Sequence, residues 1–175
     1  MGLYSILESL LTFVLGMAKA PDLQLKQGDI APAFTALNQH GATVSLDHYL
    51  GQQVVLFFYP RDNTPGCNKE ACSFRDSFAL FGDKNTVVLG VSPDSVKSHV
   101  KFVEKFSLPF LLLADETKAV ANAYGVWGEK TFMGRKYMGN HRVTFLIGAD
   151  GRIKKIWGLV SPEFHAQEIL LELQP

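Results

Sequence analysis

Cysteine is scarce in this chain, which contains only two in 175 residues. Two cysteines are too few for the disulfide scaffold of a small secreted domain, and they suit a reducing compartment in which a disulfide is transient. A zinc site would have to join both cysteines to two of the five histidines, and no histidine stands at finger-like spacing from them. The spacing disfavours that alternative, and we expect neither a metal nor a cofactor.

An excess of charge of either sign is also missing. The 17 basic and 17 acidic residues give a formal net charge of zero, which argues against a nucleic-acid or anionic-membrane surface. A hydrophobic content of 47% excludes general disorder, and the length fits a single domain with a proper core. We interpret one local basic cluster as mostly a solvated face; it comprises Lys130, Arg135, Lys136, His141 and Arg142.

The apolar run at the N-terminus is short of the roughly 20 residues that a membrane span needs. It lacks a basic n-region and carries Glu8, so it is a poor secretory signal. We predict that residues 1–20 form an amphipathic helical extension, able to dock on a membrane or to self-associate, ahead of a domain of residues 21–175. We expect a cytoplasmic protein; export, membrane association and a translation start at Met17 are the alternatives. The stripe comprises Leu3, Ile6, Leu7, Leu10, Leu11, Val14 and Leu15.

The two cysteines stand five residues apart at the beginning of a predicted helix. Residues 54–58 form a short, continuous apolar run, as expected of a strand that is covered on both faces. Thr64 then has the character of an N-cap and Pro65 that of the first helical residue. Cys67 therefore falls in the first helical turn, where the free N–H groups and the helix dipole favour a thiolate.

The predicted helix separates the two thiols. An apolar stripe includes Cys67, whereas Cys72 lies roughly 140° around the helix and faces outward. In an intact helix their Cα atoms would be roughly 8.7 Å apart, beyond the roughly 4.4–6.8 Å that a disulfide tolerates. Bond formation therefore requires the first turns to unwind. The stripe comprises Cys67, Ala71, Phe74, Phe78 and Phe81.

A thiol pair that bonds only after a movement suits a reaction cycle. A thiolate can attack the O–O bond of a peroxide and become a sulfenic acid. A second thiol then condenses with the sulfenic acid to give a disulfide, and an external dithiol resets the pair by exchange.

The motif Pro60-x-x-x-Thr64-x-x-Cys67 resembles the active-site motif of the peroxiredoxins. The position of Cys72 is similar to that in the bacterioferritin comigratory protein, or PrxQ, branch of this family. The resemblance continues through residues 125–130 and 133–147, and it covers about residues 24–173. It implies a thiol-dependent peroxidase that reduces hydrogen peroxide and organic hydroperoxides, is recycled by thioredoxin or a glutaredoxin-like dithiol, and is a monomer.

The resemblance also implies roles for five residues. Cys67 is the peroxidatic cysteine and Cys72 the resolving one. Pro60 shields the pocket, Thr64 hydrogen-bonds the peroxide, and Arg142 stabilises the thiolate and polarises the O–O bond.

Each assignment has a simpler alternative. Pro60 could only end a strand, Thr64 could only cap a helix, and Arg142 could be a solvated arginine. Cys67 could be an inert core cysteine, although core cysteines rarely follow a cap and a proline at a helix start. A thioredoxin-type reductase would want Cys-x-x-Cys, which the spacing disfavours. A redox sensor or binding module would use the same cysteines without turnover.

The remaining pattern predicts an α/β protein with the thioredoxin-like fold, in which helices flank a central mixed sheet with an N-terminal hairpin. Strands are expected at residues 33–37, 43–46, 54–58, 87–92, 110–113, 143–147 and 153–159. Helices are expected after Pro65, at about residues 95–106, at 117–124, and after a cap at residues 161–163. In the second of these helices, Val96, Val100 and Val103 should form the buried stripe.

Overall fold

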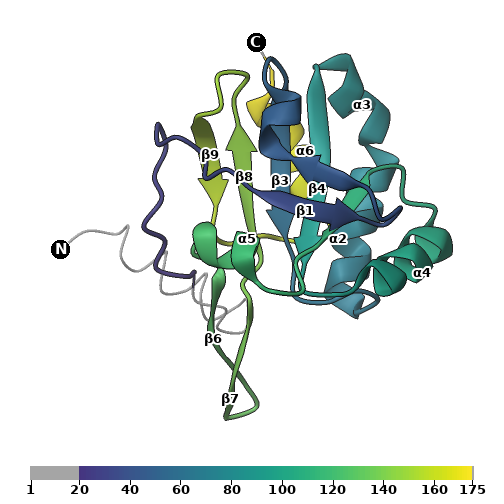
Figure 1. Cartoon of the computed structure of the whole chain (residues 1–175), viewed down its shortest axis with the longest axis vertical. Coiled ribbons are helices and arrows are strands. Elements are labelled where there is room, and N and C mark those ends of the chain that lie inside the picture. Colours follow the sequence, from purple (N-terminus) through teal and green to yellow (C-terminus); the bar gives the residue numbers. More distant parts are fainter. Residues whose placement is uncertain (1–19, 175) are drawn as a thin grey trace.

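The computed structural model describes residues 20–174 (Figure 1). A seven-stranded sheet forms the centre, in the order β2-β1-β5-β4-β3-β8-β9. The three inner strands β5, β4 and β3 run parallel, whereas β1 and β8 join them antiparallel, so the sheet is mixed as predicted. The bounds are β1 Thr35–Asn38, β2 Thr43–Ser45, β3 Gln53–Phe58, β4 Thr86–Ser92, β5 Leu111–Ala114, β8 Val143–Ile147 and β9 Ile153–Trp157.

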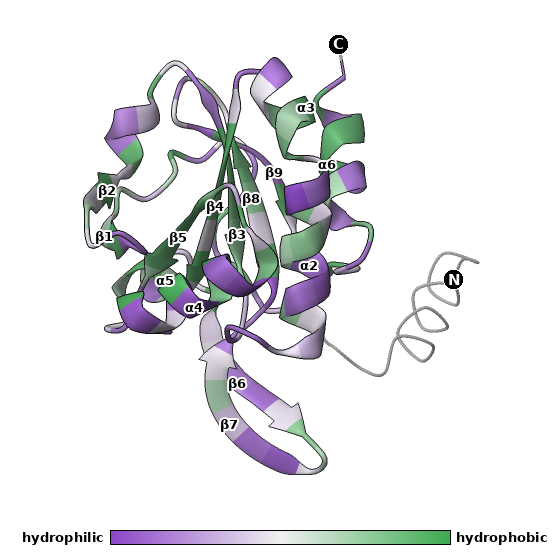
Figure 2. Cartoon of the chain, turned by 90° about the vertical axis from the view of Figure 1, so that its right-hand side faces the viewer, coloured by the Kyte–Doolittle hydropathy of each residue, from purple (hydrophilic) through white to green (hydrophobic). Residues whose placement is uncertain are grey.

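Helices cover both faces of this sheet. Strand β3 explains the two layers, because its alternate side chains enter two different hydrophobic clusters. One cluster joins β3 to α5, and the other joins it to α2, α3, α4 and α6. Figure 2 shows α2, α3 and α6 together on one side of the sheet. The bounds are η1 Leu46–Tyr49, α2 Pro65–Asp76, α3 Phe78–Asp83, α4 Val96–Phe106, α5 Ala119–Ala123 and α6 His165–Glu172.

Three details of the helices correct the prediction. The apolar stripe that begins at Cys67 spans two helices rather than one, because the chain leaves helical geometry at Ser77, a residue type that competes for backbone hydrogen bonds. In α4 the fully buried side chains are His99 and Phe102, not the valines. The last helix begins only at His165, after the predicted cap.

A second sheet was not predicted at all. Strands β6 (Trp127–Phe132) and β7 (Arg135–Asn140) form a two-stranded hairpin that extends away from the body of the domain (Figures 1 and 2). The two residues of its turn, Met133 and Gly134, both have positive φ angles, 48° and 76°. These angles are typical of the tight turns that suit the twist of a hairpin.

The predicted helical extension in residues 1–20 lies outside the described residues, apart from Ala20. Within residues 20–174, none of the helices combines the length and the apolar character that crossing a bilayer demands.

Candidate active site

Cys67 lies in the first turn of α2, with its side chain only 2% exposed. The helix begins at Pro65 and its N-cap residue is Thr64, as predicted. The Thr64 hydroxyl does not cap the helix, however, because it donates a hydrogen bond of 3.0 Å to the carbonyl oxygen of Arg61. The N–H groups of Gly66 and Cys67 have no acceptor inside the helix, so they add positive potential beside the sulfur.

Arg142 reaches Cys67 through the sheet. Strand β8 runs antiparallel to β3, and Val143 pairs with Phe58, which places Arg142 beside the chain that leads into α2. Its Nη2 lies 3.3 Å from the Cys67 sulfur, within hydrogen-bond distance of a thiolate. A side chain at Gly66 would lie only 3.1 Å from the same nitrogen, so the glycine leaves room for the guanidinium.

The other half of the guanidinium forms an ion pair with Glu70, whose side chain is fully buried. Burial raises the pKa of Glu70 to about 7, although Arg142 opposes this shift. Burial by itself would lower the pKa of Arg142, but the charges of Glu70 and Cys67 together raise it. Arg142 thus stays cationic and is held between the Glu70 carboxyl group and the Cys67 sulfur.

Lys130 adds a second cation from the hairpin. Its ammonium group donates a hydrogen bond of 2.9 Å to the carbonyl oxygen of Asn140. Burial and the charge of Arg142 lower the pKa of Lys130, while Cys67 opposes the shift. Among residues 20–174 no carboxylate lies within ion-pair distance of this ammonium group. Its charge therefore acts on the site without a local counterion.

The chain segment before α2 is held by a network of buried polar side chains. Asp62 accepts hydrogen bonds from the Tyr59 hydroxyl at 2.6 Å and from the Ser98 hydroxyl at 2.8 Å. Its second oxygen also lies 2.8 Å from Nδ1 of His99. The backbone N–H of Asp62 donates to Asp94 at 2.8 Å.

A further tie joins the hairpin to this segment, because Nδ2 of the buried Asn140 donates to the carbonyl oxygen of Tyr59 at 3.3 Å. Pro60 is half-buried between these ties. The segment that leads into Cys67 is therefore fixed from α4 and from β7.

Cys72 is half-buried on the same continuous helix as Cys67, and both are free thiols. Both sulfurs therefore lie on one intact helix, as predicted, although Cys72 is half-buried rather than fully outward-facing. The described residues contain no cluster of three or more histidine, cysteine or acidic side chains that could hold a metal ion.

Sequence reasoning missed several residues of the site. Glu70 carried a usable signal, because it stands three positions after Cys67 and so falls near the apolar stripe, where an acidic residue is unusual. Lys130 was predicted to lie on a mostly solvated face but is half-buried, and Asn140 was not predicted as a site residue. Nothing in the local sequence of either residue indicates that a hairpin brings it to Cys67.

The profile of the AhpC/TSA family matches residues 27–156, well over half of the chain. The chain belongs to this family. It is 49% identical over 156 residues to peroxiredoxin Bcp of Bacillus subtilis, which covers 89% of this chain and 92% of the relative. It is 43% identical over 146 residues to peroxiredoxin Bcp of Escherichia coli, with 83% and 94% covered.

Solved structures agree with these relatives. A PrxQ mutant of Xylella fastidiosa matches with a TM-score of 0.80 at 36% identity, covering 86% of this chain and 96% of the other. The bacterioferritin comigratory protein of Xanthomonas campestris, described for its alkyl peroxide reduction activity, matches with a TM-score of 0.78 at 32% identity, with 87% and 97% covered. The predicted thioredoxin-like fold is confirmed, and the chain is a thiol-dependent peroxidase of the peroxiredoxin class.

Proposed function

We propose that Cys67 is the residue that attacks the peroxide and that Arg142 activates it. The observation that supports this assignment is the 3.3 Å contact between Nη2 of Arg142 and the Cys67 sulfur at the start of α2. A permanently charged guanidinium next to the sulfur, together with the helix N-terminus, favours the thiolate over the thiol. Only the thiolate is an effective nucleophile toward a peroxide.

The first chemical step is a displacement on the O–O bond. The thiolate of Cys67 attacks one oxygen, the O–O bond breaks, and the other oxygen leaves as water or alcohol after it takes up a proton. Thr64 assists when its hydroxyl turns from the Arg61 carbonyl, which it contacts at 3.0 Å, to the bound peroxide. Pro60, half-buried beside the site, keeps water from the reacting sulfur.

The second step uses Cys72. The sulfenic acid on Cys67 condenses with the Cys72 thiol, which forms a disulfide and releases one water molecule. Because both cysteines belong to α2, the first turns of this helix unwind before the sulfurs meet. Gly66 and Asn68 are weak helix formers, which lowers the cost of unwinding there.

An external dithiol, thioredoxin or a glutaredoxin-like protein, then reduces the disulfide. The substrates are hydrogen peroxide and organic hydroperoxides; the Xanthomonas campestris neighbour, described for alkyl peroxide reduction, supports the second class. We assign the enzyme to the cytoplasm as a monomer. Residues 1–20 form an extension that docks on a membrane or self-associates, and residues 21–175 are the peroxidase domain.

Turnover tests the assignment and separates an enzyme from a sensor. The wild-type protein should consume many equivalents of hydrogen peroxide when a dithiol is supplied, and Cys67→Ser should consume none. Cys72→Ser should react once and then accumulate sulfenic and sulfinic forms on Cys67. Oxygen adducts on Cys72 with Cys67 still a thiol, measured by intact-protein and peptide mass spectrometry, would overturn the roles. A single equivalent consumed by the wild-type protein would instead identify a sensor.

A further inference from the structure

The hairpin of β6 and β7 exposes large apolar side chains that its own sheet leaves uncovered. Phe132 is 67% exposed, Met133 at the turn 87%, and Tyr137 47%. The strands are otherwise mainly hydrophilic, and the turn is hydrophobic (Figure 2). A contiguous apolar patch at the end of a projecting element marks an interaction surface more often than isolated exposed residues do.

The pairing register sorts the hairpin into two faces. Phe132 pairs with Arg135 and Lys130 with Tyr137, so these four side chains share one face. We call the exposed part of it, Phe132, Arg135 and Tyr137 together with Met133, the docking face. The opposite face carries the pairs formed by Glu129 with Met138 and by Thr131 with Lys136.

The two faces also differ in charge. On the opposite face Lys136 forms an ion pair of 3.1 Å with Glu129, so its charge is balanced locally. Arg135 on the docking face has no carboxylate within ion-pair distance among residues 20–174. The docking face is therefore apolar at its end and cationic next to it, although the whole chain has no net charge.

We propose that the docking face binds the surface of an anionic lipid bilayer. Phe132 and Met133 would enter the headgroup region, Tyr137 would lie at the level favoured by amphipathic aromatic rings, and Arg135 would contact lipid phosphates. A narrow turn suits this partner better than a protein, because a stable protein interface needs about 800 Å² on each side. The open edges of a two-stranded hairpin limit insertion to the interface, since hydrocarbon cannot satisfy their backbone groups.

The hairpin that carries the docking face also contacts the active-site segment, which connects lipid binding to the peroxidase reaction. Lys130 lies on the same face, directly opposite Tyr137, and its ammonium group donates to the carbonyl oxygen of Asn140. The Asn140 side chain in turn bonds to the segment that leads into Cys67. A bilayer on this face would therefore be bound by the same hairpin whose base contacts the active-site segment. Hydroperoxides formed on lipid chains would be brought to Cys67 at a high local concentration. This extends the proposed peroxidase function to a class of substrate, whereas the binding itself does not depend on that function.

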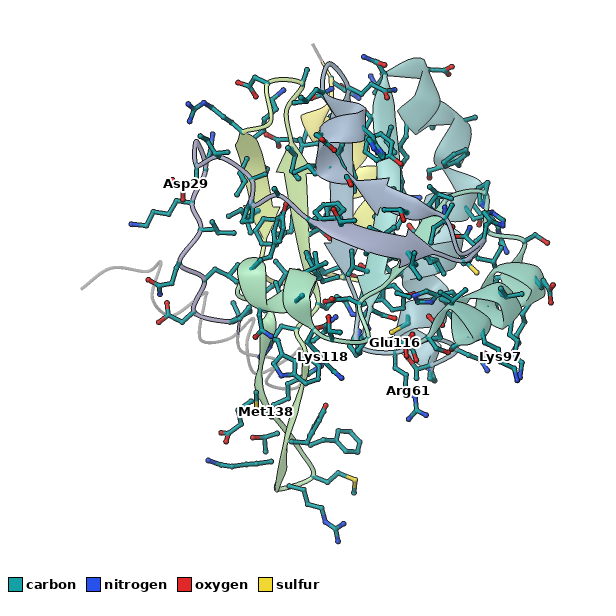
Figure 3. All side chains as sticks on the ribbon, viewed as in Figure 1. Asp29, Arg61, Lys97, Glu116, Lys118 and Met138 are labelled. Carbon is teal, nitrogen blue, oxygen red and sulfur yellow. The ribbon has the colours of Figure 1, made fainter. Side chains whose placement is uncertain are left out.

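Co-sedimentation of the full-length protein with vesicles tests the proposal. The vesicles contain either phosphatidylcholine alone or phosphatidylcholine with phosphatidylglycerol. The wild-type protein should bind the anionic vesicles preferentially, and 0.5 M salt should weaken the binding. Phe132→Ser and Arg135→Gln should each reduce binding by about tenfold. Met138→Ser and Lys136→Gln are the matched controls on the opposite face, where Met138 is 54% exposed and projects from the hairpin (Figure 3), and they should bind nearly as the wild type.

Four results would overturn the proposal. Equal binding by Phe132→Ser and the wild type, or equal losses for the two faces, would show that the docking face is not the contact. Binding lost only when residues 1–16 are removed would assign it to the N-terminal segment. Binding to an acidic protein without any binding to anionic vesicles would identify a protein partner. Consumption of hydrogen peroxide in solution should be unchanged in all four variants, and a wild-type protein that consumes none would count against the proposed function alone.

Discussion

The chain on the two sides of Cys67 is held in contrasting ways. Before it, Asp62 is fixed by the side chains of Tyr59, Ser98 and His99 and, through its backbone, by Asp94. After it, the first two turns of α2 contain two buried oxygens without hydrogen-bond partners, Oδ1 of Asn68 and Oε1 of Glu70. On the first side Nε2 of His99 and Oδ1 of Asn140 also lack partners, but each of these side chains keeps a hydrogen bond to the segment of residues 59–62. A buried polar atom without a partner weakens the folded arrangement around it.

The difference matches the two tasks of the proposed cycle. Peroxide binding requires a fixed geometry around Pro60, Thr64 and Arg142, and the network around Asp62 supplies a rigid support for it. Disulfide formation requires the helix to open, and the weakly satisfied turns after Cys67 are the part that opens at low cost. Farther along α2, Phe74 is fully buried and Ser73 contacts α6, so the opening should end there.

The largest effect is expected at Arg142, which contacts the Cys67 sulfur. Arg142→Lys should slow the first oxidation of Cys67 by about 10²–10³-fold, because an ammonium group cannot contact the sulfur and Glu70 with one planar fork. Stopped-flow fluorescence with hydrogen peroxide measures this rate. Arg135→Lys, an exposed arginine on the hairpin, is the matched control and should react like the wild type. A folded Arg142→Lys variant that oxidises at wild-type speed would return Arg142 to the role of a solvated arginine.

Disrupting the hydrogen-bond network around Asp62 should lower the free energy of unfolding. Asp62→Ala leaves Tyr59 and His99 buried without their shared acceptor, and we expect it to lower the free energy of unfolding by about 2–3 kcal/mol. Asp76→Ala at the exposed end of α2 serves as the control and should change it by less than about 0.5 kcal/mol. Urea denaturation measures both. Equal stabilities for the two variants would show that the network does not hold the segment.

The titration of Glu70 tests the segment that is expected to open, because Glu70 lies in the first two turns of α2. Burial raises its folded-state pKa from 4.5 to about 7, so the folded protein binds more protons than the unfolded chain between these pH values. The stability contribution is therefore fully present below about pH 4.5 and is lost as the pH rises through 7.

Measured against Glu70→Gln, the wild-type free energy of unfolding should fall by roughly 2–3 kcal/mol between pH 4.5 and pH 8. Glu168→Gln, on the half-exposed surface of α6, provides a comparison for general effects of charge removal. Parallel pH curves for the wild type and Glu70→Gln would mean that the carboxyl group titrates normally.

The features predicted from the sequence are those that depend on neighbours in the chain. A cap-like threonine and a proline locate the start of α2, and the apolar run before them locates β3, because both signals act over a few residues. The strands predicted at residues 143–147 and 153–159 likewise correspond to β8 and β9, which pair in the structure.

The features that were missed depend on distant partners. His99 is buried in α4 because Asp62, 37 residues earlier, accepts its hydrogen bond, and no periodicity of α4 reveals that partner. The hairpin of β6 and β7 packs little of its surface into a core, so its strands lack the apolar pattern that marked the others. The ion pair of Arg142 with Glu70 likewise requires the pairing of β8 with β3 before it can be recognised.

Amide hydrogen exchange in the two redox states tests the contrast between the sides of Cys67 most directly. The protein is compared as the dithiol and as the disulfide, with the bond between Cys67 and Cys72 confirmed by mass spectrometry. Exchange should become faster across residues 66–74 in the disulfide form, whereas residues 59–62 should keep the same protection in both forms. Equal protection of residues 66–74 in the two forms would contradict the opening of α2. A loss of protection at residues 59–62 in the disulfide form would contradict the claim that this segment stays fixed.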